Sequence, residues 1–382
     1  MIPIGNIVTV NARYLTFMRI ENYFRATVTV FLYCNIVILS CREDNTMKAV
    51  QLTNGFGFEE LTMTELDKPT PGPKEVLIRM RAASLNYRDL VVLGGLMPIE
   101  VKFPFIPLSD GAGEIVAIGP GVTRFQVGQR VAGNFQQRFI GGNPRPGVLE
   151  ESLGGPLNGV AAEYVVLHED GVVPIPDHLT YEEASTLPIA ALTAWSMLIE
   201  YGGLQAGDTV LLQGTGGVSI FGLQFSLMAG ARVIITSSSN DKLERAKALG
   251  AWQTINYSEV PDWDKAALEL TGGVDHVLDV GGAATMGKSI NALRTGGTVS
   301  MVGFLSGLTI AEYDVSSILH KAATVRGSQV GNRDHFEKMN RAIAHHRLHP
   351  VIDRVFPLNR IGEALALLAE GKQYFGKIVV QI

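Results

Sequence analysis

A glycine-rich turn between a buried strand and a helix is the first stretch of this chain that could do chemistry. Residues 210–212 form an apolar run typical of a strand inside a parallel sheet, and 218–228 predict a helix packed on that sheet. A glycine turn of this kind leaves backbone N–H groups free at the helix N-terminus and lets a phosphate approach closely. The stretch 208–257 therefore predicts half of a dinucleotide-binding fold. We expect the cofactor to contact Gly214, Thr215, Gly216, Gly217 and Val218.

The turn departs from the usual G-x-G-x-x-G pattern at one position. Ser219 stands where the third glycine is expected, and Gly222 follows one turn later. Methyltransferases and flavoproteins use similar loops, so the prediction depends on the strand–loop–helix context rather than on the motif alone. The alternative is a tight turn that binds no ligand.

The second strand of this half ends in hydroxyl groups rather than in a carboxylate. An NAD site needs an acid about 20 residues beyond the loop to accept from the ribose 2′-OH. Here Ser237 and Ser238 occupy that place, Lys242 follows within one turn, and Tyr257 ends the next strand. Because a phosphate needs donors and positive charge, this set favours NADP(H) over NAD. Asp241 better suits the helix N-terminus, and a solvated surface lysine is the alternative for Lys242.

Composition excludes several classes of protein. The chain has 382 residues, enough for two domains, and a net charge of −5 without a lysine or arginine run, so we expect no nucleic-acid partner. Its only cysteines, Cys34 and Cys41, precede Met47. From Met47 onward the sequence therefore excludes disulfides and thiolate metal sites.

Residues 1–46 differ from everything that follows. They carry Arg13, Arg19 and Arg25 and then an apolar run, 26–39, that is shorter than the ~20 residues a membrane span needs. A targeting segment is one interpretation, but no A-x-A-like cleavage site stands out. Met47 with Lys48 resembles a natural protein start, so a mis-assigned start codon is the favoured interpretation. We expect a cytoplasmic protein that does not associate with membranes.

From Met47 the pattern is first all-β and then alternates strands with helices. Short strands separated by turn residues predict a small barrel, with a glycine- and proline-rich loop at 134–159. Expected strands lie at 48–52, 61–65, 75–82, 111–116, 129–131 and 161–167, and helices at 181–187 and 193–201. Beyond Tyr257 the alternation predicts a parallel sheet with helices on both faces. Its further elements are expected at 263–270, 274–280, 284–293 and 298–302, with an edge strand at 324–330, helices at 335–345 and 361–368, and a last strand at 377–382.

Five motifs in this order give the chain its resemblance to a known family. They are Ser84-Leu85-Asn86-Tyr87-Arg88-Asp89, Asp110-Gly111-Ala112-Gly113-Glu114, Gly119-Pro120-Gly121 with Val127-Gly128-Gln129-Arg130-Val131, Leu192-Thr193-Ala194-Trp195, and the glycine loop. The body from Met47 resembles the medium-chain dehydrogenase/reductase superfamily. The resemblance implies an α/β fold with a GroES-like β-barrel catalytic domain (47–175 and 326–382) and a doubly wound Rossmann parallel-sheet domain (176–325). It also implies a homodimer through the edge strand near Val325.

The superfamily divides into zinc-dependent and zinc-independent members. Zinc-dependent members place one ligand at Asn86 or a near neighbour, one at Ser109 and one near Ile189, and none of these positions supplies a soft ligand here. The chain therefore resembles the zinc-independent branch, close to NADPH:quinone oxidoreductases and enone reductases, and no metal is expected. Lys242 and Tyr257 match the phosphate-binding lysine and tyrosine of that branch.

The catalytic candidates come from the first of these motifs. The nicotinamide supplies hydride, and the protein must orient the acceptor and stabilise the charge that develops on its oxygen. Asn86 and Tyr87 can both donate to that oxygen, although Tyr87 could instead pack in the cleft wall. Asp89 matches a family position as well, with a structural hydrogen bond to nearby backbone as its expected role.

Further cofactor contacts are expected where other strands of the sheet end. Thr193 resembles the threonine that the family places beside the nicotinamide. Gly281, Val302, Gly303 and Phe304 follow two strand ends, where ligands of open α/β sheets bind. Gln329, Asn332 and Arg333 follow the edge strand and could reach the cofactor, with a solvated loop as the alternative.

The leading hypothesis is an NADPH-dependent, metal-free oxidoreductase that transfers hydride to a quinone or an α,β-unsaturated carbonyl compound. Conjugation spreads the developing charge, so such acceptors need no metal to polarise a carbonyl group. One alternative is an NADP-linked alcohol or aldehyde dehydrogenase. Another is a non-catalytic relative that retains cofactor binding.

Overall fold

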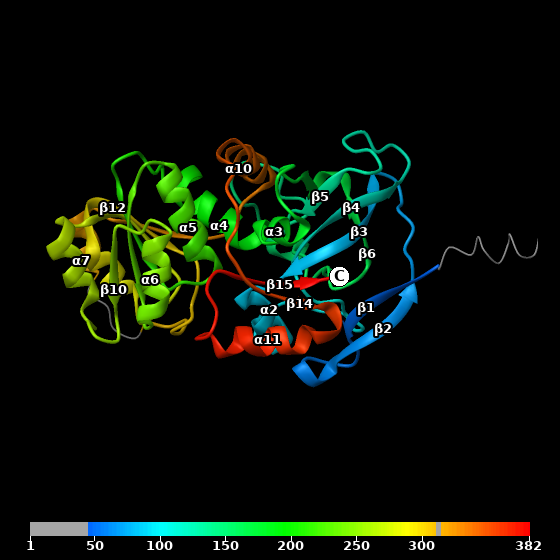
Figure 1. Ribbon diagram of the computed structural model, residues 1–382, viewed down its shortest axis with the longest axis horizontal. Helices are drawn as coiled ribbons and strands as arrows, with labels where there is room; N and C mark the ends of the chain where they lie inside the picture. Colours follow the sequence, from blue (N-terminus) through cyan, green and yellow to red (C-terminus); the bar gives the residue numbers. More distant parts are fainter. Residues whose placement is uncertain (1–44, 311–314) are drawn as a thin grey trace, which may run out of the picture. The chain divides into compact units, whose positions relative to one another are not determined.

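The computed structural model describes residues 45–310 and 315–382 (Figure 1). The chain divides into two compact units, Met1–Met47 and Lys48–Ile382. The predictions made for residues 1–46 fall almost entirely outside the described residues and stay predictions.

A six-stranded parallel sheet forms one half of the second unit. Its order is β10-β9-β8-β11-β12-β13, and every neighbouring pair is parallel. The strands are β8 (Thr209–Gln213), β9 (Arg232–Ser237), β10 (Gln253–Asn256), β11 (Val274–Asp279), β12 (Leu293–Met301) and β13 (Thr324–Gly327). The chain order reverses between β8 and β11, which is the switch point where doubly wound sheets bind ligands. The predicted Rossmann-type sheet is confirmed.

Helices cover both faces of the parallel sheet, as the apolar strands require. They are α5 (Gly217–Met228), α6 (Asn240–Ala248), α7 (Trp263–Thr271), α8 (Met286–Ala292) and α9 (Ser316–Lys321). Successive residues of β8 belong to different cores, since Val210 and Leu212 pack with α5 and α6 while Leu211 packs with α7 and α8. A strand buried on both faces reads as a continuous apolar run, which is the pattern seen at 210–212.

A second, mixed sheet forms the other half. Its order is β14-β15-β3-β4-β5-β7, and β6 also pairs with β3. The strands are β3 (Glu75–Ser84), β4 (Asp110–Ile118), β5 (Arg130–Gly133), β6 (Tyr164–His168), β7 (Val172–Pro174), β14 (Ile352–Pro357) and β15 (Lys377–Gln381), and β1 (Thr46–Leu52) pairs separately with β2 (Leu61–Asp67). The C-terminal strand β15 lies antiparallel to β3, with Val379 opposite Ser84. The end of the chain therefore lies beside β3, the first strand of the mixed sheet in chain order (Figure 1).

Short helical segments make up most of the differences from the sequence-based prediction. The sequence patterns did not indicate α2 (Tyr87–Leu93), β7 or β14, and the edge strand ends at Gly327 rather than at 330. The two helices expected at 181–187 and 193–201 are α3 (Tyr181–Ser185) and α4 (Leu192–Trp195), with π-helical turns at Leu187–Ala191 and Ser196–Glu200. Such turns shift the helical register and are frequent at functional sites. Four 3₁₀ turns complete the count for the described residues: Phe58–Glu60, Val148–Glu151, Glu169–Gly171 and Leu358–Arg360.

One apolar core joins the two halves. It contains Ala112 and Ala132 of the mixed sheet together with Phe225 of α5. The Phe225 ring lies 5.5 Å from the Trp195 ring, edge to face. Helix α10 (Arg333–His346) adds Phe336 to the same core. The last helix, α11 (Ile361–Glu370), comes between β14 and β15 in the chain. Within residues 45–310 and 315–382, no helix is both long and apolar enough to cross a membrane.

The missing third glycine of the nucleotide loop is compensated one turn later. The hydroxyl of Ser219 is buried and donates to the carbonyl oxygen of Gln213 at 2.6 Å, so its polar group is satisfied against the strand. The close helix–sheet contact lies at Gly222, where a Cβ would be 3.0 Å from Cδ2 of Leu212 and 3.2 Å from Cδ2 of Leu278. Gly222 thus provides the packing that the third glycine normally provides.

We expect Gly222→Val to lower the free energy of unfolding by about 1–3 kcal/mol, because its methyl groups would overpack β8 and β11. The matched control is Gly362→Val in α11, where a Cβ would meet no atom within 4 Å. That control should change stability by roughly 0.5 kcal/mol or less. Urea unfolding followed by circular dichroism measures both, and equal stability of the two variants would contradict the packing role of Gly222.

Candidate active site

The glycine loop lies at the end of β8 and is open above its backbone. Gly214 has a φ of 71°, a left-handed conformation that favours glycine. A Cβ at Gly214 or Gly216 would meet no atom within 4 Å, and no side chain caps the N-terminus of α5. Backbone N–H groups at an uncapped helix start suit a phosphate. The loop therefore leaves room for a phosphate, and its role as a dinucleotide cradle stays a prediction.

The segment that leads into β15 holds this loop from one side. Gly376 donates its N–H to the carbonyl oxygen of Thr215 at 2.9 Å, and Gly376 pairs with Gly216 in an isolated β-bridge. The side chain of Lys377 lies against Gly217, where a Cβ would be 2.6 Å from Cδ of the lysine. The C-terminal strand thus contacts both the cofactor loop and the mixed sheet.

The ammonium group of Lys377 ends beside Asn86. Lys377 Nζ donates to Asn86 Oδ1 at 2.7 Å and to the carbonyl oxygen of Leu85 at 2.6 Å. Lys377 is 3% exposed and Asn86 is 8% exposed. The other polar atom of the amide, Asn86 Nδ2, is buried and has no hydrogen-bond partner. A buried donor without a partner is uncommon and needs an explanation, such as a bound ligand.

Asp110 balances the buried ammonium group. Its Oδ2 accepts from the N–H of Ile189 at 3.2 Å and lies 3.9 Å from Lys377 Nζ, while its Oδ1 has no partner. Burial raises the pKa of Asp110 to about 7, against the opposing effects of the Lys377 charge and of the nearby Asn86 side chain. Burial also lowers the pKa of Lys377, against the opposing effects of Asp110 and Asp89. Charges this deeply buried are tolerated only because they are paired.

Asp89 is placed at the start of α2 in a structural role. Its Oδ2 accepts from the N–H of Asn86 at 2.7 Å, and its Oδ1 accepts from the Ser109 hydroxyl at 3.3 Å. Arg88 donates to Ser109 at 3.2 Å and to the carbonyl oxygens of Gly154 and Gly155. These contacts fix the helix that carries Asn86 and Tyr87, which agrees with the backbone contact expected for Asp89.

The two halves of the unit meet at a pair of aromatic rings. Tyr87 comes from α2 and Phe304 follows β12, and their ring centres lie 6.3 Å apart in an edge-to-face arrangement. Tyr87 is 45% exposed and Phe304 is 42% exposed. Both were expected at the site, and their partial exposure leaves apolar surface for a flat ligand.

The strand ends predicted to contact the cofactor lie together at the switch point. Gly281 donates its N–H to Gln213 Oε1 at 3.3 Å, which ties the end of β11 to the end of β8. Val302 donates to the carbonyl oxygen of Asp279 at 2.8 Å, and a Cβ at Gly303 would lie 2.6 Å from the carbonyl oxygen of Val280. Thr193 is buried in α4, next to the π-helical turn that bonds Asp110.

The residues expected to bind a 2′-phosphate also gather at neighbouring strand ends. Asn256 of β10 pairs with Ser237 of β9, and Tyr257 donates its N–H to the carbonyl oxygen of Ser237 at 3.1 Å. Ser238 is exposed beside them. Lys242 Nζ lies 5.7 Å from the centre of the Tyr374 ring, and burial lowers its pKa, with Asp353 acting in the opposite direction.

Two of the last three predicted residues, Asn332 and Arg333, have partners in the structure away from the loop. Asn332 accepts from the N–H of His335 at 2.8 Å and donates to the carbonyl oxygen of Gly142 at 3.1 Å. Arg333 donates to Asp170 Oδ1 at 2.8 Å. Gln329 Oε1 is buried without a partner. Asn332 and Arg333 thus connect the start of α10 to loops of the mixed-sheet half.

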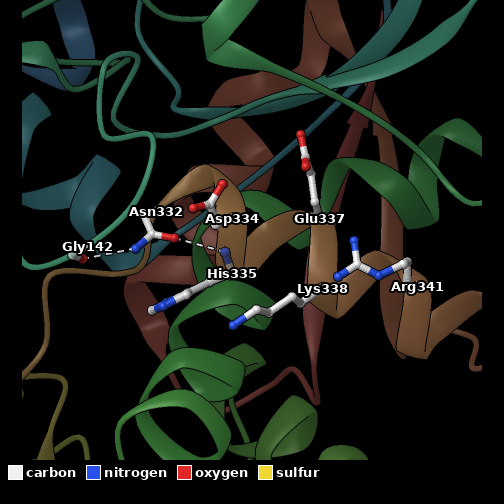
Figure 2. Close-up of a pocket in the computed structure, with 7 residues that line it drawn as sticks. All are labelled: Gly142, Asn332, Asp334, His335, Glu337, Lys338 and Arg341. Carbon is white, nitrogen blue, oxygen red and sulfur yellow. Dashed lines mark hydrogen bonds between the residues drawn. The ribbon is translucent and has the colours of Figure 1, made fainter.

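A polar pocket of about 300 Å³ lies along α10 (Figure 2). Among the predicted site residues it contains only Asn332, and none from the glycine loop. It is lined by Gly142, Asn332, Asp334, His335, Glu337, Lys338 and Arg341. Most of its lining consists of charged side chains of α10. The predicted site lies elsewhere.

Sequence reasoning missed Lys377 and the part that Asp110 plays with it. Lys377 was assigned only to a last strand, and Asp110 was used only as part of a motif. One signal was present in the sequence: a lysine directly before the apolar run Ile378-Val379-Val380 must either face solvent or be paired inside. The partner could not be read from the sequence, because 291 positions separate Lys377 from Asn86.

Two protein families match different parts of this chain. The family described as alcohol dehydrogenase GroES-like domain matches residues 72–177, and the family described as zinc-binding dehydrogenase matches residues 217–345. A zinc-type alcohol dehydrogenase-like protein of Schizosaccharomyces pombe is 42% identical over 334 residues, covering 85% of this chain and 96% of that protein. The chain is a medium-chain dehydrogenase/reductase. Members of this superfamily are oxidoreductases that use a nicotinamide cofactor.

Other relatives carry different names within the superfamily. A quinone oxidoreductase of Pseudomonas aeruginosa is 34% identical and covers 68% of this chain and 74% of that protein. A solved structure from Sinorhizobium meliloti, described as an alcohol dehydrogenase, superposes with a TM-score of 0.84 at 42% identity and covers 88% of this chain and 99% of that chain.

Two further solved structures bear on the cofactor. An NAD-dependent alcohol dehydrogenase superposes with a TM-score of 0.80 at 36% identity, covering 88% of this chain and all of that chain (100%). A 2-octenoyl-CoA carboxylase reductase in complex with NADP and 2-octenoyl-CoA superposes with a TM-score of 0.78 at 26% identity, covering 88% of each chain. The fold thus accommodates either dinucleotide, so the choice for this chain depends on its own residues.

Proposed function

We propose that this medium-chain dehydrogenase/reductase is an NADPH-dependent, metal-free reductase of quinones or α,β-unsaturated carbonyl compounds. The observation that carries the proposal is the buried, unpartnered Nδ2 of Asn86 on the residue next to the half-exposed Tyr87. A fixed amide donor beside an apolar ring suits a flat molecule with one oxygen to be stabilised.

The donor set around Asn86 does not fit a zinc ion. A catalytic zinc takes about three nitrogen, sulfur or carboxylate ligands, whereas the positions expected to supply them hold Asn86, Ser109 and Ile189. The one oxygen that Asn86 offers already accepts from the Lys377 ammonium group, whose positive charge would repel a metal cation. Within the described residues, no three histidine, cysteine or acidic side chains gather in a way that could hold a metal ion. The proposed reaction therefore uses no metal.

The residues at the site suffice for a conjugated acceptor. When bound, the nicotinamide of NADPH supplies the hydride. As hydride reaches the β-carbon of an enone, the electrons of the conjugated system shift onto the carbonyl oxygen, and Asn86 Nδ2 donates to that oxygen. The phenol of Tyr87 is a second donor on the same helix start. A proton from water then completes the saturated product.

A simple ketone is a poorer acceptor for this site. Its developing charge stays on one oxygen, and amide donors stabilise a localised alkoxide less than a Lewis-acidic metal does. The names of the quinone oxidoreductase and the 2-octenoyl-CoA reductase support conjugated acceptors for this chain. The relatives named alcohol dehydrogenase favour a second candidate, an NADP-linked alcohol or aldehyde dehydrogenase.

An absorbance assay at 340 nm separates the two candidates. We expect the purified chain, treated with a chelator, to oxidise NADPH with a quinone or an enone and to give little reduction of NADP with a primary alcohol. Metal analysis of the same sample should find less than stoichiometric zinc. Turnover with the alcohol alone, or loss of activity that zinc restores, would refute the proposal.

The preference for NADPH is supported by the groups at the ends of β9 and β10. Ser237, Ser238, Lys242 and Tyr257 offer hydroxyl donors and one ammonium group. The strand end carries no carboxylate that would accept from a ribose 2′-OH, and Asp241 is exposed in the first turn of α6, where it suits the helix dipole. Lys242 is partly buried, so its charge is less screened than that of a free surface lysine.

We expect Lys242→Met to weaken NADPH binding about tenfold, equivalent to ~1.4 kcal/mol, and to leave NADH binding unchanged. Quenching of protein fluorescence by each nucleotide gives the two dissociation constants. Lys247→Met, an exposed lysine on the same helix, is the matched control. Equal weakening for both nucleotides, or none for either, would place the phosphate elsewhere.

A homodimer through the edge of the parallel sheet is proposed as the assembled form. β13 is the last strand in the sheet order, and Val325 on it is 42% exposed. Leu308 and Leu319, which precede the strand in sequence, are also largely exposed. Exposed apolar side chains around an open strand edge are typical of an interface. Sedimentation equilibrium should give twice the mass of the chain, and a monomer at micromolar concentration would contradict this.

A further inference from the structure

Lys377 is buried between the glycine loop and the Asn86 amide, and it contacts both. We propose that Lys377 is a positioning residue for reduction: it fixes the amide of Asn86 with Nδ2 turned toward the acceptor oxygen and couples that orientation to the glycine loop. This inference rests on the proposed reductase function and adds a residue to it.

The orientation of the Asn86 amide follows from what an ammonium group can do. An asparagine amide can face a neighbour with either its oxygen or its nitrogen, whereas an ammonium group only donates. With Lys377 Nζ at 2.7 Å, the amide must present Oδ1 to the lysine. Nδ2 is then left pointing away from the lysine, and it is the atom found buried without a partner. The lysine thus converts an ambiguous side chain into a fixed donor.

The positive charge also strengthens that donor. A charge-assisted hydrogen bond to Oδ1 polarises the amide, and hydrogen bonds in a chain reinforce one another in a low-dielectric interior. Lys377 is 3% exposed, so water does not screen its charge. Donation from a polarised Nδ2 to an oxygen that gains negative charge is worth more in the transition state than in the ground state.

The lysine itself is held from two sides. Its ammonium group is balanced by Asp110 Oδ2 at 3.9 Å and bonded by the carbonyl oxygen of Leu85. Its alkyl chain packs against Gly217, and the preceding Gly376 bonds Thr215. A dinucleotide bound on the glycine loop therefore lies against the same residue that orients the catalytic amide.

A double-mutant cycle on kcat tests whether Lys377 acts through Asn86. The proteins are wild type, Lys377→Met, Asn86→Ala and the double variant, assayed at saturating NADPH with an enone. We expect each single variant to lower kcat at least tenfold, and the double variant to match Asn86→Ala within twofold. The dissociation constant for NADPH should change less than threefold in Asn86→Ala. Losses that multiply in the double variant, or a kcat unchanged by Lys377→Met, would overturn the proposal.

Two further variants serve as controls, one for a loss of folding and one for the effect of a lysine-to-methionine change elsewhere. Lys377→Met leaves Asp110 buried without its counter-ion, so Lys377→Met with Asp110→Asn removes both charges and should keep the fold. That pair should show the same loss in kcat, and wild-type kcat in it would overturn the proposal. Lys372→Met, an exposed lysine five residues earlier, is the matched control and should retain wild-type kcat.

A measurement without turnover separates this inference from the proposed function. Selective ¹⁵N labelling of asparagine side chains follows the Asn86 amide directly. We expect one sharp pair of Nδ2 proton signals in wild type, shifted or averaged in Lys377→Met. An unchanged pair would refute the positioning role even if the enzyme reduces enones. A wild-type protein that reduces neither quinones nor enones would instead refute the proposed function, while the amide signals still decide the role of Lys377.

Discussion

The structure depends on a buried ammonium group that is held between a carboxylate and an amide. Removing a charge from water costs several kcal/mol, so Lys377 is stable inside only with Asp110, Asn86 and the Leu85 carbonyl oxygen around it. Those partners are available because the last strand, β15, returns to lie beside β3. The same return brings Gly376 onto the cofactor loop. One contact thus aligns the end of the chain, the catalytic motif and the nucleotide cradle.

In the proposed mechanism, a dehydrogenase fold presents a charge to the substrate without a metal ion. The amide of Asn86 would contact the substrate, and the Lys377 ammonium group behind it would polarise that amide. Asp89 and Arg88 hold the start of α2 through their hydrogen bonds, and the Tyr87 ring lies edge to face with Phe304, which follows β12. Preorganised donors of this kind cost no rearrangement when charge develops on a substrate. The choice of acceptor then depends on how far that charge can spread.

Much of the fold was predictable from the sequence because its signals are local. The apolar run at 210–212 indicates a strand covered on both faces, and its residues do alternate between two cores. Ser219 replaces the glycine expected in the loop, and the structure shows that Gly222 makes the close contact with Leu212 and Leu278 instead. By contrast, α2 is only seven residues long and its cap comes from Asp89, so no hydrophobic period marks it. The pairing of Lys377 with Asn86 joins distant positions, and no local pattern can indicate it.

The most direct measurement is a crystal structure of the chain with NADP⁺ and an enone bound. We expect the dinucleotide on the glycine loop, its 2′-phosphate near Lys242, and the carbonyl oxygen of the enone about 3 Å from Asn86 Nδ2. Lys377 should still donate to Asn86 Oδ1. An enone oxygen held by other groups, a metal ion between Asn86 and Ser109, or an Asn86 amide turned with Oδ1 toward the substrate would contradict the mechanism.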